Sequence, residues 1–189
     1  MDSDTILILG IGNLLWADEG FGVRAVEAMN ERWRFPDHVR LLDGGTQGLY
    51  LIQHVEEARR LIVFDAIDYG LPSGTMKIIL NDEVPMYLGA KKMSLHQTGF
   101  QEVLACARLT GHYPDELVLI GVQPVELDDF GGSLRSEVKA RIEPALDAAL
   151  EWLARWGVVP EPRLDAALPL GPESLNIRAY EERPPGDSA

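Results

Sequence analysis

ILILGIGNLLWADEGFGV, residues 6–23, joins an apolar run to a glycine-containing turn and then to two adjacent acidic residues. The apolar run begins at Thr5 and ends at Leu9, and such a run is typical of a strand buried on both faces of a sheet. Apolar residues then recur every three to four positions between residues 19 and 33, which predicts a helix. A strand, a turn and a helix in this order indicate a fold in which strands and helices alternate.

The same alternation continues along the chain to about residue 157. Further strands are predicted at 39–42, 60–64, 74–80 and 117–120, and further helices at 47–58, 100–111 and 133–156. Ser133 is expected to cap the last helix, and Pro144 to kink it. The sequence therefore predicts an α/β fold with three layers: a mostly parallel, twisted sheet of about five strands with helices on both faces.

The end of the chain differs in composition from the rest. Six of the twelve prolines lie at or after Pro160, and the last residues, EERPPGDSA, are polar. We therefore expect residues 1–159 to form a single α/β domain, and residues 160–189 to form a proline-rich, poorly ordered or loosely packed tail.

Composition narrows the classes of partner and of compartment. The net charge of −13 argues against nucleic acid, because binding to phosphates needs clustered Lys and Arg. One cysteine, Cys106, allows no internal disulfide and no cluster of thiolate ligands. No signal-peptide pattern and no apolar run of membrane-spanning length is present in the sequence. We expect a cytoplasmic protein with no membrane partner.

Acidic residues follow three of the predicted strands. They are Asp18 and Glu19, then Asp43, then Asp65. Each has an ordinary explanation, because carboxylates favour helix N-termini and Asp favours turns. Together, however, they gather at the carboxyl ends of the strands, where folds of this class bind their ligands. This coincidence favours a functional site at that edge.

The glycine turn is not typical of a dinucleotide-binding loop. Gly10 and Gly12 begin such a motif, but Leu15 stands where its third glycine would be. Asp18 and Glu19 would also repel a pyrophosphate at the helix N-terminus. We expect no nucleotide cofactor; the alternative, a nucleotide-binding protein, predicts affinity for a dinucleotide.

His96 is the best placed of the four histidines, in a small polar stretch that leads into a helix. With Glu19 and Asp65 it would supply two oxygen donors and one nitrogen donor. Three protein ligands with an open position are typical of a catalytic or exchangeable divalent metal site. These donors do not by themselves select nickel over zinc.

Residues 5–157 resemble the maturation endopeptidases of nickel–iron hydrogenases. The resemblance rests on GIGNLLWADEGFGV, LLDGGTQG, FDAIDYG, SLHQTG and LIGVQP, in this order and spacing. It implies that Glu19, Asp65 and His96 are the metal ligands. It also implies that Asp43 is a catalytic acid or a residue that supports the ligands.

The resemblance further implies a function. Members of this family remove a short C-terminal peptide from the hydrogenase large-subunit precursor after nickel insertion, so the nickel would be supplied by the precursor. Whether the metal activates water, or only anchors the precursor while Asp43 or Asp65 acts as base, is left open. The alternatives are a non-catalytic nickel-dependent assembly chaperone for the same precursor, and a hydrolase with permanently bound zinc.

Overall fold

The computed structural model describes residues 4–88, 95–172, 175 and 177–182, without the side chains of 87, 88, 95–98, 178 and 179. Its main sheet has five strands. In spatial order they are β3 (Val39–Gly45), β1 (Ile6–Ile11), β4 (Arg60–Ala66), β6 (Glu116–Val122) and β5 (Met76–Leu80). The first four strands run parallel, and β5 pairs antiparallel with β6 at the edge.

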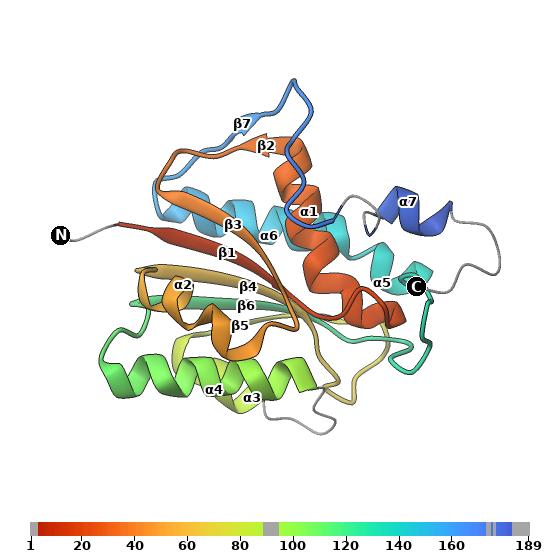
Figure 1. Ribbon diagram of the computed structural model, residues 1–189, viewed down its shortest axis with the longest axis horizontal. Helices are drawn as coiled ribbons and strands as arrows, with labels where there is room; N and C mark the ends of the chain where they lie inside the picture. Colours follow the sequence, from red (N-terminus) through yellow and green to blue (C-terminus); the bar gives the residue numbers. More distant parts are fainter. Residues whose placement is uncertain (1–3, 89–94, 173–174, 176, 183–189) are drawn as a thin grey trace.

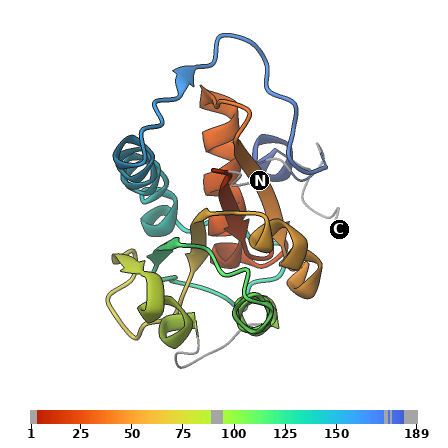
Figure 2. The same cartoon turned by 90° about the vertical axis from the view of Figure 1, so that its left-hand side faces the viewer.

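Helices cover both faces of this sheet (Figures 1 and 2). α1 (Phe21–Arg32) and α6 (Ile142–Arg155) lie on one face. α2 (Ile52–Glu56) and α4 (Leu95–Thr110) lie on the other, together with the short α3 (Val84–Leu88). The predicted three-layer α/β architecture is confirmed. No helix in the described ranges combines the length and the apolar character needed to cross a bilayer.

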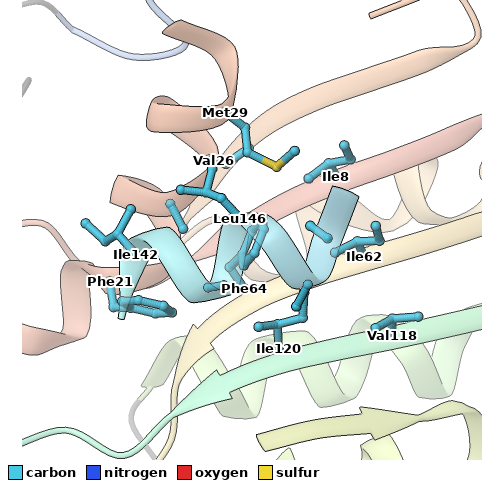
Figure 3. Packing of buried hydrophobic residues seen from close by; sticks show 14 of the residues in the cluster. Ile8, Phe21, Val26, Met29, Ile62, Phe64, Val118, Ile120, Ile142 and Leu146 are labelled. Carbon is cyan, nitrogen blue, oxygen red and sulfur yellow. The ribbon is translucent and has the colours of Figure 1, made fainter. Parts of the chain in front are cut away.

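The central strands are buried on both faces, so their side chains alternate between two cores. Ile8, Phe64 and Ile120 point toward α1 and α6, where Figure 3 shows them packed around Leu146. Residues one position along, such as Leu9, belong to the core beneath α2 and α4. This alternation means that a side chain's position in its strand decides which helices it faces.

The predicted long C-terminal helix is instead two helices. α5 spans Ser136–Lys139, and α6 begins at Ile142. Ser133 does not cap a helix, because Arg135 precedes α5 and the Ser133 hydroxyl donates to Glu181 Oε1 at 2.7 Å. Pro144 produces no mid-helix kink, because it lies in the first turn of α6, where its missing N–H has no intrahelical partner to lose.

Part of the proline-rich tail packs against the domain, contrary to the expectation of loose packing. β7 (Glu161–Pro162) pairs antiparallel with β2 (Trp33–Arg34), which follows α1. The chain then reaches α7 (Ile177–Glu181), near α1 (Figure 1), where Tyr180 is only 3% exposed. The domain boundary at residue 159 stays a prediction.

The order of the strands defines one candidate location for a site. β1 and β4 are adjacent parallel strands. The chain leaves β1 toward α1 on one face, whereas the helices that follow β4 lie on the opposite face. Ligands of open α/β sheets bind at the carboxyl ends of two such strands, where the chain leaves neighbouring strands toward opposite faces of the sheet. Those ends lie at the right of Figure 1, where α1 and α4 begin.

Candidate active site

Asp65 lies at the carboxyl end of β4 and is fully buried. Its neighbour Phe64 points toward α1, so Asp65 points to the opposite face, which α4 covers. His96 lies in the first turn of α4, but its side chain is outside the described residues. The structure therefore brings the helical turn of His96 to the face of Asp65 without giving a distance between the two side chains.

Two glycines bring the start of α4 close to the segment that follows β3. Gly48, with φ 54°, opens the 3₁₀ turn η2 (Gly48–Leu51). A Cβ atom added to Gly99 would lie 3.0 Å from the Gly48 Cα. The backbones touch only because neither residue has a side chain.

Glu19 lies in the 3₁₀ turn η1 (Ala17–Gly20), which contacts β4. Gly12 makes room for this turn, because a Cβ atom there would lie 1.8 Å from the Glu19 carbonyl oxygen. The Asn13 N–H donates to that same oxygen at 3.2 Å. The glycine turn therefore holds the backbone of an acidic residue, where a dinucleotide loop would hold a phosphate.

Asp18 has a different role from that of its neighbour. It is fully buried, and its carboxylate accepts backbone N–H bonds from Val125, Glu126 and Arg135 at 2.7–2.9 Å. The N-cap position of α1 belongs to Gly20, so helix capping does not explain Asp18. The two adjacent acids therefore differ: Asp18 is buried and binds the segment that follows β6, whereas Glu19 is half buried.

Asp43 shares the edge with Asp65 but not the face. Asp43 and Phe64 both pair with Gly10, from the two sides of β1, and both belong to the α1 face by their place in the strand alternation. β3 and β4 are separated by β1, so their backbones lie about 10 Å apart. The strand-end acids therefore gather at one edge, as predicted, but on opposite sides of the sheet.

The tail covers the Asp43 carboxylate. A Cβ atom added to Gly171 would lie 2.8 Å from Asp43 Oδ2. Burial raises the pKa of Asp43, and this rise is opposed by a backbone hydrogen bond with Gly45 and by the positive charge of Arg24. The catalytic role of Asp43 stays a prediction.

Arg24 is a buried cation between α1 and the tail, with only 5% exposure. It donates to Glu27 Oε2 at 3.0 Å and to the carbonyl oxygen of Leu175 at 2.5 Å, and it lies over the ring of Tyr180. Burial raises the pKa of Glu27, while Arg24 acts in the opposite direction. Arg24, Glu27 and Asp43 therefore form a charged cluster on the α1 face, beneath the tail.

The candidate site includes two residues that sequence reasoning did not select. Gln123, directly after β6, accepts the N–H groups of Tyr69 and Leu71 and so holds the loop that follows β4. Tyr69 lies on the face of Asp65, because a Cβ atom on Gly121 would lie 2.0 Å from its hydroxyl and Gly121 pairs with Asp65. The motifs FDAIDYG and LIGVQP contained both residues, but neither type stands out as a ligand.

The metal set proposed from the sequence is left untested. No group of three His, Cys, Asp or Glu side chains close enough to hold a metal ion occurs among the described residues. His96 is not among those side chains, so Glu19, Asp65 and His96 stay predicted ligands. The buried Asp65 carboxylate, at an edge that η1 and α4 both reach, suits a divalent cation.

Sequence comparisons show which known proteins this chain resembles. A family model described as hydrogenase maturation protease matches residues 23–152. The hydrogenase expression/formation protein HupM of Azotobacter chroococcum mcd 1 is 66% identical over 183 residues, covering 96% of this chain and 88% of that protein. The hydrogenase 2 maturation protease of Escherichia coli K12 is 45% identical over 159 residues, covering 84% and 96%.

Solved structures give the same result. The hydrogenase maturating endopeptidase HybD from E. coli superposes with a TM-score of 0.80 at 43% identity. The match covers 86% of this chain and 99% of that structure. A maturation protease HybD from Thermococcus kodakarensis superposes with a TM-score of 0.64 at 27% identity, covering 78% and 98%.

Proposed function

Because the chain belongs to the hydrogenase maturation protease family, we propose that it removes a C-terminal peptide from the nickel-loaded large-subunit precursor of a nickel–iron hydrogenase. The observation that supports this proposal best is the position of Asp65. Its carboxylate is fully buried at the carboxyl end of β4, and the neighbouring strand is β1. At this end the chain leaves β1 and β4 toward opposite faces of the sheet. The turn that carries Glu19 contacts β4. A buried carboxylate at that point needs a cation or hydrogen-bond donors to offset its desolvation.

In this proposal nickel arrives with the precursor as part of the substrate. Glu19, Asp65 and His96 would hold it through two carboxylates and one imidazole, and the remaining positions would be filled by ligands of the precursor. A divalent metal held there would polarise the scissile carbonyl, or lower the pKa of a bound water from about 15.7 toward about 7. Cleavage would then depend on nickel insertion, because an empty precursor would lack the group that these residues recognise.

In this proposal, residues of the chain hold the site in position and supply the base that takes a proton from the attacking water. Asp65 is held by the pairing of β4 with β6, and Gln123 holds the loop that follows it. A base for the attacking water fits the face of Asp65 better than the position of Asp43, because Asp43 is turned toward α1 and the tail. We therefore propose that Asp43, which lies on the opposite face of the sheet, supports the site without acting as the base for the attacking water.

The decisive experiment is a cleavage assay with purified precursor, with and without nickel, read out by mass spectrometry. The wild-type chain should shorten only the nickel-loaded precursor. E19Q, D65N and H96A should each slow cleavage by about a hundredfold or more. E57Q and D115N change two exposed carboxylates, one directly after α2 and one directly before β6, and should cleave normally.

The outcomes separate the alternatives. Normal cleavage by all three site variants would refute the proposed ligand set. Binding of the precursor without shortening would favour the assembly chaperone. A stoichiometric zinc ion in the freshly purified chain, with cleavage of the nickel-free precursor, would favour a conventional zinc hydrolase.

A further inference from the structure

The loop at residues 124–135, which follows β6, is attached to the chain around Asp18. Asp18 Oδ2 accepts the N–H groups of Val125 and Glu126 at 2.8 and 2.9 Å, and Oδ1 accepts that of Arg135 at 2.7 Å. The Asp18 N–H in turn donates to the Glu126 carbonyl oxygen at 3.1 Å. One carboxylate therefore joins the two ends of the 124–135 loop.

These bonds are strong because the carboxylate is fully buried. Hydrogen bonds from N–H groups to an ionised acceptor are about twice as strong as neutral ones, and a buried charge without them would be costly. The side chain uses both oxygens at once. An amide of the same shape has only one acceptor oxygen, so the attachment depends on the carboxylate itself.

The middle of the loop contacts the turn that carries Glu19. The Gly131 N–H donates to the Leu15 carbonyl oxygen at 2.7 Å, and the rings of Trp16 and Phe130 meet edge to face, with centroids 5.3 Å apart. The Glu19 N–H donates to the Trp16 carbonyl oxygen at 2.8 Å. Phe130 is 50% exposed, so an aromatic side chain is presented at the surface beside the Glu19 turn.

We propose that Asp18 is a positioning residue, which holds the 124–135 loop beside Glu19 so that Phe130 contacts the hydrogenase precursor during cleavage. The proposal rests on the proposed function. The precursor is the expected occupant because its scissile bond must reach Glu19, and the loop borders the turn that bears this residue. Asp18 then acts on recognition of the precursor, whereas Glu19 acts on the reacting centre.

The test combines amide exchange with steady-state kinetics for D18N. Asn has a single acceptor oxygen, so it should keep either the bonds from Val125 and Glu126 or the bond from Arg135. Hydrogen exchange should therefore become faster at the amides whose bonds are lost. KM for the nickel-loaded precursor should rise about tenfold, as expected for loss of a hydrogen bond to a charged group, with a smaller change in kcat. F130A should raise KM in the same way, because it removes the proposed contact with the precursor while leaving the three bonds to Asp18 in place.

D129N is the matched control, because it makes the same chemical change within the loop. It removes the exposed ion pair of Asp129 with Arg135 at 2.8 Å but leaves the three bonds to Asp18. KM of D129N should therefore rise much less than KM of D18N, and an equal rise would show that the bonds to Asp18 are not what holds the loop in position.

A normal KM in both D18N and F130A would overturn the proposal, as would a loss confined to kcat. If D18N does not fold, F130A alone decides, since Phe130 is half exposed and its removal leaves the core intact. If the wild-type chain binds the precursor without cutting it, the protease function fails. The loop is then still tested, because the binding constant replaces KM.

Discussion

At the scale of single residues, adjacent side chains at the rim of the sheet have different environments. Asp18 is fully buried and bound to three backbone N–H groups, whereas Glu19 is half buried in the same turn. Gly12 fixes the backbone of this turn, with φ 141° and no space for a side chain. The placement of the candidate ligand Glu19 therefore depends on a residue that has no side chain at all.

We predict that G12A destabilises the fold and displaces Glu19. The added methyl group would lie 1.8 Å from the Glu19 carbonyl oxygen, so the loss in free energy of unfolding should be about 3 kcal/mol or more, from backbone strain and steric overlap together. G111A is the control, because Gly111 also has positive φ, at 78°, but nothing within 4 Å of the added atom, so about 1 kcal/mol is expected. Urea unfolding measures both. Equal losses would show that steric overlap at Gly12 is not the cause.

Asp43 gives a prediction about pH, because burial raises its pKa above the ordinary 3.8. The folded chain then binds this proton more tightly than the unfolded chain. The resulting stabilisation is complete below pH 3.8 and is lost as the pH rises through the raised pKa. D43N has no such proton, so its stability relative to the wild-type chain should improve as the pH rises from about 3.5 to about 6.5.

Urea unfolding of D43N at the two pH values tests this sign. E57Q is the control, because the hydrogen bond from Arg40 lowers the pKa of Glu57, so the stability of E57Q relative to the wild-type chain should not improve as the pH rises. A D43N difference that is constant with pH, or that worsens as the pH rises, would contradict the burial of Asp43 beneath the tail.

At the scale of elements, sequence patterns predicted what depends on local composition. The apolar runs around Ile8, Ile62 and Leu119 are strands because such runs bury both faces of a parallel sheet. The break before α6 was not predicted, because an apolar stripe continues through it and Pro144 suits the first turn of one helix as well as the interior of a kinked one.

For the candidate site, the sequence predicted the edge of the sheet at which the acids lie but not the face to which each belongs. Alternation of strands and helices placed Glu19, Asp43 and Asp65 at one edge of the sheet. The face of Asp43 depends on its pairing with Gly10 and on the packing of the tail, and both are contacts between segments far apart in the chain. Helix capping was only one explanation that the sequence offered for Asp18, and its hydrogen-bond partners could not be predicted because they lie more than a hundred residues later.

At the scale of the whole molecule, the tail completes the α1 face of the domain. Arg163 donates to the Asn30 carbonyl oxygen, and the Asn30 side chain donates to that of Leu168. Lys139 pairs with Glu181 at 2.8 Å, and this pair, together with a bond from Ser133, lowers the pKa of Glu181. The tail is thus attached along most of its described length, despite its proline content.

We predict that deleting residues 160–189 destabilises the domain, because Arg24 would lose the Leu175 carbonyl oxygen and the ring of Tyr180. Y180A isolates the largest part of this effect. Tyr180 is 3% exposed, so its truncation should cost about 3 kcal/mol or more in urea unfolding. L164A is the matched control within the tail, because Leu164 is 96% exposed and its loss should change stability by less than about 0.5 kcal/mol. If the shortened chain and Y180A unfold at the same urea concentration as the full chain, the tail is only loosely associated and Asp43 does not owe its burial to it.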